Sequence, residues 1–285
     1  MKPMERAAVL GAGTMGAGIA QFLAAKGVEV TLRDIDEEPL EKGLDVIRRQ
    51  LQRQVDRGRM ASSDVDTILS RIHPATDLDC LAPVEWVIEA VVERLSVKQA
   101  LFQDVEQVVG REAVLATNTS SLSVTAIASV LQNPERFLGL HFFNPAPVMP
   151  LVEVVSGERT DPAAANRAVE WLRRLGKTPI QVADTPGFLV NRVARPFHTE
   201  PYRLVSTGVA DKAQVDRILR SAGFPMGPFE LQDLIGIDIN LAASEAVYEG
   251  FYHDPRFRPH PGQRKMVESG SLGRKVKRGH FTHES

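Results

Sequence analysis

The chain has 285 residues, of which 43% are hydrophobic and 25% are charged, and its formal net charge is −2. This profile excludes a disordered chain and gives no reason to expect a nucleic-acid partner. One cysteine excludes an internal disulfide, no cysteine–histidine spacing suggests a metal site, and no apolar run predicts a membrane helix or a signal peptide, so we expect a cytoplasmic protein.

A strand, a loop, a helix and a second strand open the chain. An apolar run over 7–10 predicts the first strand, a Gly-x-Gly-x-x-Gly string follows it, and a helix over 19–26 precedes a second strand over 28–33. In this context the string predicts a dinucleotide site, because the glycines let a pyrophosphate approach the backbone at the start of the helix. The alternative is a glycine turn in an unrelated α/β protein. The predicted cofactor residues of the loop are Gly11, Gly13, Thr14, Met15 and Gly16.

The acid that ends the second strand indicates which dinucleotide binds. The carboxylate of Asp34 can accept hydrogen bonds from the ribose of NAD and would repel the 2′-phosphate of NADP. Asp34 could instead be a cap at the end of a strand, and the neighbouring Arg33 could help to accept a phosphate. We favour NAD.

Helical periodicity follows the second strand. Apolar residues at three- and four-residue steps predict an amphipathic helix over 40–55, and a second short helix is predicted over 63–72, capped by Ser62 or Ser63. The outer face of the longer helix is basic. It carries Arg48, Arg49 and Arg53.

Strands then alternate with helices as far as Asp184. Strands are predicted over 86–92, 113–116, 137–143 and 151–155, with a helix over 97–109. This alternation predicts an α/β fold with a Rossmann-like, doubly wound, mostly parallel sheet. After Asp184 the pattern is mainly helical. We therefore expect a Rossmann-like domain over 1–184 and an all-α C-terminal domain over 185–285.

Polar residues lie at or near the ends of three predicted strands, in Asn118–Ser121, in His141–Pro145 and at Glu153. Ligands of doubly wound sheets bind at the carboxyl ends of strands. Oxidation of an alcohol needs a base near neutral pH, and His141 is the candidate. Glu153 lies between apolar residues and is costly to bury unless it is paired, and pairing with His141 would fix the imidazole tautomer. The alternative is that Glu153 faces solvent on an edge strand.

Six short motifs occur in a fixed order along nearly the whole chain. They are Gly11–Gly16, Glu89–Glu93, Asn118–Ser121, His141–Pro145, Asp184–Phe188 and Met226–Leu231. This ordered set resembles the L-3-hydroxyacyl-CoA dehydrogenases, including the 3-hydroxybutyryl-CoA members. The resemblance implies the reversible oxidation of an (S)-3-hydroxyacyl-CoA to a 3-ketoacyl-CoA with NAD, in β-oxidation of fatty acids or related acyl-CoA metabolism.

The resemblance also implies catalytic roles for four residues. His141 would take the 3-hydroxyl proton, and Glu153 would orient the imidazole. Ser120 and Asn191 would hydrogen-bond the substrate oxygen or the imidazole. The role of Asn191 comes from the family alone, because nothing in its surroundings distinguishes it from a surface residue.

Further binding roles are implied in the same way. Glu93 and Lys98 match family positions that contact the nicotinamide ribose. Asn118 on the cofactor side and Asn144 on the substrate side match neighbours of the reacting groups. The family also implies a helical projection at about 40–72, whose basic residues would reach the phosphates of CoA but could equally form a solvated charged face. It further implies a homodimer formed through the C-terminal helical domain.

One departure from the family lies near the C-terminus. Family members often end in a string like Gly-Arg-Gly-Phe-Tyr, whereas this chain has Lys277–Thr282, within a segment rich in basic residues and histidine. The departure leaves open whether the tail docks, is solvated or binds an acidic partner.

Three other functions remain as alternatives at this stage. The chain could oxidise a small hydroxy acid or a sugar acid such as gulonate with the same fold. It could be a crystallin-like NAD-binding protein without activity, against which the presence of Ser120, His141, Glu153 and Asn191 argues. It could also be a sensor or scaffold that uses the basic tail.

Overall fold

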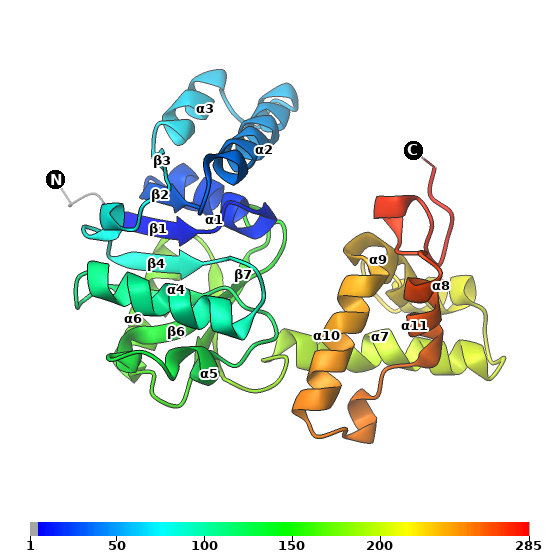
Figure 1. The fold of residues 1–285 in the computed structure, drawn as a ribbon. Helices are drawn as coiled ribbons and strands as arrows, with labels where there is room; N and C mark the ends of the chain where they lie inside the picture. The colour runs from blue at the N-terminus through cyan, green and yellow to red at the C-terminus, as the bar shows by residue number, and fades with distance from the viewer. Residues whose placement is uncertain (1–4, 285) are drawn as a thin grey trace. The chain divides into compact units, whose positions relative to one another are not determined.

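The computed structural model describes residues 5–284, and the chain divides into two compact units, residues 1–184 and residues 185–285. Figure 1 shows the first unit as a sheet with helices on its faces and the second unit as a group of helices. None of the helices within residues 5–284 is long and apolar enough to span a membrane.

A doubly wound, mostly parallel sheet forms the first unit, which confirms the predicted fold class. Among the described residues, eight strands lie in the order β3-β2-β1-β4-β5-β6-β7-β8. β6 and β7 pair antiparallel, whereas the other neighbouring strands pair parallel. The strands are β1 (Arg6–Leu10), β2 (Glu29–Arg33), β3 (Ile72–Ala75), β4 (Trp86–Glu89), β5 (Val114–Thr117), β6 (Phe137–Phe142), β7 (Leu151–Ser156) and β8 (Thr178–Ala183).

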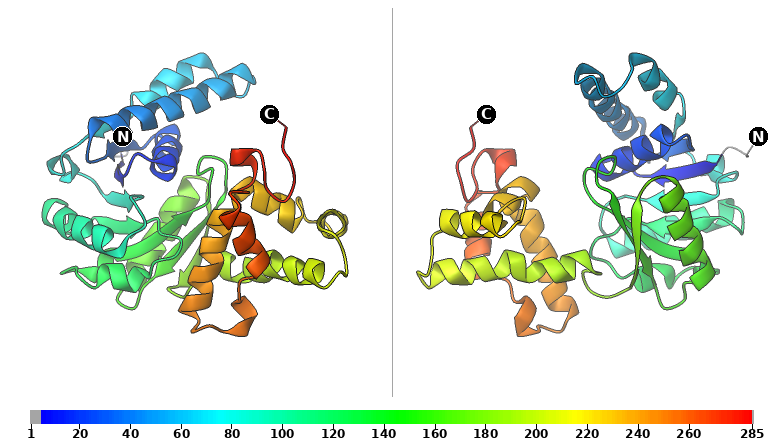
Figure 2. Two further views of the ribbon diagram at one scale, coloured as in Figure 1. Left: turned by 45° about the vertical axis from the view of Figure 1, so that its right-hand side comes forward. Right: turned by 180° about the vertical axis from the view of Figure 1, so that it is seen from behind.

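Successive side chains of each strand point to opposite faces of the sheet, and helices bury both faces. On one face of the sheet, α1 (Thr14–Ala25) and α6 (Pro162–Arg174) pack against alternate strand residues in one apolar cluster. The right-hand view of Figure 2 looks onto this face. Figure 1 shows α4 (Leu95–Val108) and α5 (Val124–Ala128) over the other face. The strand residues that point to this second face include four polar ones, Glu89, Thr117, His141 and Glu153.

The helical projection consists of α2 (Glu37–Asp56) and α3 (Ser62–Leu69), which pack against each other and against α1. Figure 2 shows the two helices standing beyond the β2–β3 edge of the sheet. α2 buries Leu40, Ile47 and Leu51 and leaves its arginines outside. This arrangement follows from the amphipathic pattern of the sequence.

The predicted end of the second projecting helix is wrong. The helix expected over 63–72 ends at Leu69, and Ile72 begins the edge strand β3 instead. The segment lacks alternating apolar residues and contains Pro74, which is tolerated because an edge strand has a neighbour on one side only. The N-cap is Ala61 rather than Ser62 or Ser63.

The strand expected over 86–92 also ends early, at Glu89. The carboxylate of Glu89 accepts the backbone N–H of Val91 at 2.7 Å. A side chain therefore takes a donor that a continuing strand would have given to its neighbour, and the chain turns away from the sheet at this point.

The second unit is helical, as the sequence predicts, and its described helices enclose a small core around Tyr202, Val215 and Phe229. Phe281 from the C-terminal tail packs against this core. The helices are α7 (Val190–Ser206), α8 (Lys212–Ser221), α9 (Pro228–Ile235), α10 (Ile237–Gly250) and α11 (Pro261–Glu268).

The C-terminal tail docks on α9 despite its departure from the family's usual ending. The buried carboxylate of Asp233 accepts the backbone N–H groups of His280 and Phe281 at 2.8 and 3.0 Å, and it lies 2.8 Å from Nε2 of His283. The ring of His280 contacts the hydroxyl of Tyr202 at 2.9 Å. A single buried acid thus organises the end of the chain.

Candidate active site

The glycine loop between β1 and α1 has the shape that a dinucleotide requires. Gly11 has a φ of +98°, and a Cβ there would lie 2.6 Å from the carbonyl oxygen of Ala90. A Cβ on Gly16 would lie 1.8 Å from the carbonyl oxygen of Gly11, so α1 can only pack this closely on the loop without a side chain. Beside Gly13 there is open space within 4 Å, where a pyrophosphate can approach the backbone.

The start of α1 supplies donors for that pyrophosphate. Gly13 is the N-cap and has no side chain to accept the first N–H groups, and Thr14 and Met15 are the first two helical residues. The N-terminal N–H groups and the helix dipole both favour a negative group at this position. The residues of the loop therefore fit NAD.

Asp34 lies directly after β2, and its carboxylate turns toward the glycine loop. Oδ2 accepts the N–H of Ala12 at 2.6 Å, and Oδ1 accepts the N–H of Ile35 at 2.8 Å. The side chain of Arg33 is engaged elsewhere, because its Nε donates to the carbonyl of Thr76 at 2.9 Å. Asp34 thus caps the end of its strand and also presents negative charge beside the loop, which suits a ribose better than a phosphate.

His141 and Glu153 lie opposite each other on β6 and β7. Nδ1 of His141 is 2.6 Å from Oε2 of Glu153, and the two side chains are 8% and 0% exposed. The alternative in which Glu153 faces solvent on an edge strand is wrong, because β8 lies outside β7 and the carboxylate is buried. Burial of the Glu153 carboxylate would be costly without the hydrogen bond to His141.

This geometry assigns different tasks to the two ring nitrogens. An ionised carboxylate can only accept, so Nδ1 of His141 carries the proton of this hydrogen bond, and Nε2 is the atom that can take up a proton. The carboxylate holds the imidazole orientation and stabilises the charge that protonation creates. The pair can therefore act as a general base.

Asn118 and Ser120 follow β5 and border His141's strand. Oδ1 of Asn118 accepts the N–H of Phe142 at 2.8 Å, which joins the ends of β5 and β6. The N–H of Ser120 donates to Oε1 of Glu93 at 3.2 Å. Asn144 follows β6 directly, two residues after that strand ends. These predicted residues thus gather at the carboxyl ends of β5 and β6.

Glu93 and Lys98 belong to a network at the neighbouring strand end. Nζ of Lys98 lies 3.1 Å from Oε2 of Glu93, while Oε1 of Glu93 accepts from the hydroxyls of Thr119 and Ser121 at 2.5 and 3.0 Å. Burial alone would raise the pKa of Glu93, but the charge of Lys98 and these hydrogen bonds outweigh it and lower the pKa. Glu93 is therefore held as a carboxylate.

Asn191 lies in the second unit, in the first turn of α7. Its backbone carbonyl accepts from Nε of Arg195 at 2.9 Å, and its Oδ1 accepts from the same guanidinium at 3.4 Å. Arg195 is itself buried and also donates to Ser244. The role of Asn191 toward the substrate stays a prediction.

Glu89 and Lys177 are among the buried charged residues of the first unit to which sequence reasoning assigned no role. Glu89 is fully buried and 2.6 Å from Nζ of Lys98. Lys177 is 7% exposed, and its Nζ donates to the carbonyls of Ala146 and Met149 at 2.6 Å each. The signal for Glu89 was present, since it is an acid within an apolar strand, as Glu153 is. Lys177 gave no such signal, because it lies between elements.

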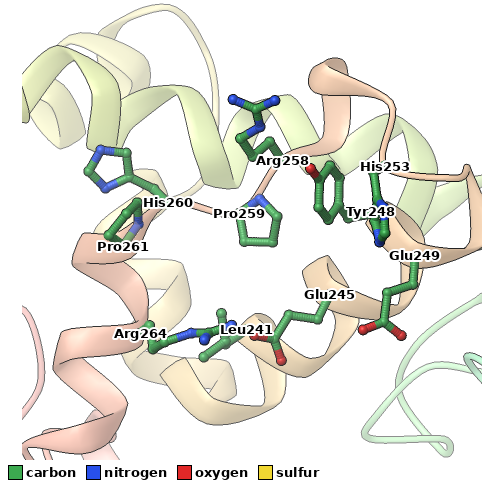
Figure 3. A pocket seen from close by; sticks show the side chains of 10 residues that line it. All are labelled: Leu241, Glu245, Tyr248, Glu249, His253, Arg258, Pro259, His260, Pro261 and Arg264. Atoms are coloured by element: carbon green, nitrogen blue, oxygen red, sulfur yellow. Dashed lines mark hydrogen bonds and ion pairs between the residues drawn. The ribbon is translucent and has the colours of Figure 1, made fainter.

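A crevice of about 380 Å³ opens in the second unit, between α10 and the chain that leads into α11. Figure 3 shows its side chains around an open space, with Glu245 and Arg264 on one side, where they form an ion pair at 2.6 Å. Acidic side chains (Glu245 and Glu249) and basic ones (Arg258 and Arg264) both line the crevice, whereas none of the predicted site residues does.

Comparisons with known proteins agree with the geometry. Residues 6–185 match the family model described as 3-hydroxyacyl-CoA dehydrogenase, NAD binding domain, and residues 187–283 match the model of the C-terminal domain of the same family. The 3-hydroxyadipyl-CoA dehydrogenase of Escherichia coli is 47% identical over 273 residues, which are 95% of this chain. This chain spans 58% of the length of that relative.

Two further relatives match over their whole length. The probable 3-hydroxybutyryl-CoA dehydrogenase of Deinococcus radiodurans is 41% identical over 276 residues, which are 96% of this chain and 99% of the relative. The crystal structure of the (S)-3-hydroxybutyryl-CoA dehydrogenase of Ralstonia eutropha matches with a TM-score of 0.94 and 36% identity, over 99% of this chain and 100% of the other.

Proposed function

The chain belongs to the 3-hydroxyacyl-CoA dehydrogenase family, and on this premise we propose that it catalyses the reversible, NAD-dependent oxidation of an (S)-3-hydroxyacyl-CoA to the 3-ketoacyl-CoA. The observation that carries the proposal is the buried pair of His141 and Glu153, with 2.6 Å between Nδ1 and Oε2. The glycine loop and Asp34 supply the site for the dinucleotide in the same unit.

The proposed chemistry separates a proton from a hydride. Nε2 of His141 takes the proton of the 3-hydroxyl group, and the hydride leaves C3 as the carbonyl forms. Bound NAD supplies the acceptor for that hydride. Glu153 stabilises the imidazolium while the proton is on the ring, and in the reverse direction the imidazolium returns the proton to the ketone oxygen.

Amide and hydroxyl side chains are proposed to bind the substrate. Ser120 and Asn191 are proposed to hydrogen-bond the substrate oxygen or the imidazole, and Asn144 to contact the substrate, so that the reacting carbon is held in place. The basic outer face of α2 is proposed to receive the phosphates of CoA, to which arginine is well matched. We further propose that the protein is a homodimer through its helical unit and acts in the cytoplasm, in fatty-acid or related acyl-CoA metabolism.

The relatives differ in the acyl group that their names carry. One is named for a six-carbon dicarboxylic acyl group, and two are named for the four-carbon 3-hydroxybutyryl group. We propose the class of short 3-hydroxyacyl-CoA thioesters as substrates.

The test follows NADH oxidation by absorbance with acetoacetyl-CoA, with NADPH and free acetoacetate in parallel. Turnover with the CoA ester and NADH alone is the expected result. Turnover with free acetoacetate at a similar rate would favour a hydroxy-acid dehydrogenase of the same fold. Binding of NADH without turnover of acetoacetyl-CoA, of longer acyl-CoA esters or of dicarboxylic ones would contradict the proposal and favour a non-catalytic NAD-binding protein.

A further inference from the structure

Three charged side chains meet at the carboxyl ends of β4 and β5, and we call Glu89, Lys98 and Glu93 the acid–lysine cluster. Nζ of Lys98 lies 2.6 Å from Oε1 of Glu89 and 3.1 Å from Oε2 of Glu93. The side chains of Glu89 and Lys98 are 0% and 1% exposed, whereas that of Glu93 is 39% exposed. One end of the cluster is therefore sealed in the protein and the other reaches the surface.

Glu89 is held from several directions. Besides Lys98, its carboxylate accepts the N–H of Val91 at 2.7 Å and the hydroxyl of Thr117 at 2.7 Å. These bonds satisfy a buried charge that would otherwise be costly, and they leave Glu89 no path to a ligand. Glu89 can therefore act on a bound molecule only by holding Lys98 in place or through the field of its charge.

Lys98 transmits the position of Glu89 to Glu93. The ammonium is shared between the two carboxylates, and Glu93 in turn binds the N–H of Ser120 and the hydroxyls of Thr119 and Ser121. The exposed carboxylate is thus fixed between a buried cation and the loop that follows β5. Without a fixed Lys98, Glu93 would keep only the bonds to that loop.

The cluster lies beside the proposed cofactor loop. Glu89 pairs with Leu10 across β4 and β1, and Gly11, which follows Leu10, packs on the carbonyl of Ala90. Asp34 marks the adenosine side of the loop, at the end of β2. Because a dinucleotide crosses the carboxyl ends of the strands on both sides of such a loop, its other half extends over β4 and β5.

The charges of the cluster do not cancel. Two carboxylates and one ammonium give a formal net charge of −1. The nicotinamide ring is a cation in NAD⁺ and is neutral in NADH, so a nearby negative charge attracts only the oxidised form. The low dielectric of a buried site strengthens this difference relative to water.

We propose that Glu89 is a positioning residue for the nicotinamide half of the cofactor: it holds Lys98 against Glu93, and it supplies the negative charge that makes the cluster favour oxidised over reduced nicotinamide. This inference rests on the proposed use of NAD and goes beyond it, since it concerns the ratio of the two affinities. A residue that merely supports the fold would change both affinities, and that of ADP, by the same factor.

The test is Glu89→Gln, which keeps the shape of the side chain and removes its charge. The amide oxygen can still accept from Lys98 and Val91, and the amide nitrogen can donate to the hydroxyl of Thr117. Dissociation constants for NAD⁺, NADH and ADP are measured by calorimetry on the full chain. We expect NAD⁺ to bind about 10-fold more weakly, the affinity for NADH to change by less than about 3-fold, and ADP to bind as before. A change of this size is what the loss of one unit charge in a partly screened site produces.

Glu106→Gln is the matched control. Glu106 is also a buried carboxylate, lies on the same helix as Lys98, and accepts the N–H groups of Gln132 and Asn133 at 2.8 and 2.9 Å. Glu106→Gln should leave the dissociation constants of NAD⁺, NADH and ADP unchanged. Thr117→Val is a second variant, which removes the hydrogen bond from Thr117 to Glu89 and keeps a side chain that is common in strands. It should weaken NAD⁺ binding relative to NADH binding, as Glu89→Gln does, but by a smaller factor.

An unchanged ratio of the NAD⁺ and NADH affinities in Glu89→Gln, with the protein folded, would overturn the inference. Equal weakening of all three nucleotides would overturn it as well, because that is the pattern of a support residue. If Glu89→Gln does not fold, an unchanged ratio in Thr117→Val overturns it instead. Failure of the unaltered protein to bind NADH at all would contradict the proposed function, so the two failures can be told apart.

Discussion

Asp34 places its carboxylate against the turn of the glycine loop, and this contact bears on the choice of cofactor. We expect Asp34→Ala to weaken NAD binding and to reduce the discrimination against NADP, because a hydrogen-bond acceptor for the ribose and a negative charge opposing the 2′-phosphate are both lost. A change of about 10-fold in the ratio of the two affinities is the expected size for one charge-assisted interaction. Titration of the protein with both nucleotides measures it, and unchanged affinities would remove Asp34 from its proposed role.

Single residues of the site differ in how far sequence can identify them. His141 and Glu153 stand out because a histidine at a strand end and an acid in an apolar strand are both unusual, and register brings them together. Glu89 carries the same signal, but its partner Lys98 lies on a helix, so pattern alone does not pair them. Asn191 has no local signal, and only the family resemblance identifies it.

At the scale of elements, the connection between β6 and β7 is important because it joins the strands of His141 and Glu153. Lys177 binds two carbonyls of this connection, and its Nζ lies 4.1 Å from the centre of the Phe22 ring on α1. Burial, together with the charge of Lys26, lowers the pKa of Lys177 to about 8. A buried ammonium here links the connection to α1.

We expect Lys177→Met to destabilise the protein by about 1–3 kcal/mol, because the apolar stem remains but two buried carbonyls lose their donor. Urea unfolding gives the change in the free energy of unfolding. Lys26→Met is the matched control, since Lys26 is exposed and should change stability by no more than about 0.5 kcal/mol. Equal stability of the two variants would contradict the structural role of Lys177.

Elements with a clear period or a distinctive loop could be predicted, and the others could not. The first strand, the glycine loop and the helix over 40–55 combine strong patterns, and their ends lie within a few residues of those observed. α6 and β8 were not predicted. β8 is a half-exposed edge strand that contains Pro179, so it lacks both alternation and the apolar run of a buried strand.

At the scale of the whole chain, stability should depend on pH through the helical unit. Burial lowers the pKa of His280 to about 4, with the charge of Lys212 acting in the same direction and that of Asp233 opposing it. An unfolded histidine has a pKa near 6.5. Between these values the unfolded chain takes up a proton that the folded chain does not, so the free energy of unfolding falls as the pH falls from about 6.5 toward 4.

His280→Phe isolates this contribution, because phenylalanine keeps a ring against Phe229 and cannot titrate. Between pH 7 and pH 5 the unaltered protein should lose about 1–2 kcal/mol more stability than the variant. Urea unfolding at the two pH values measures the difference. Equal losses would mean that His280 does not remain neutral in the folded tail.

We propose that the His141–Glu153 pair performs the proton transfer of a 3-hydroxyacyl-CoA dehydrogenase. The most direct measurement compares NADH oxidation with acetoacetyl-CoA by the unaltered protein and by His141→Ala, with the dissociation constant of NADH determined on the same preparations. We expect His141→Ala to lose turnover by at least ~100-fold and to retain NADH binding, since general base catalysis typically contributes 10²–10⁴-fold. Near-normal turnover by the variant would contradict it.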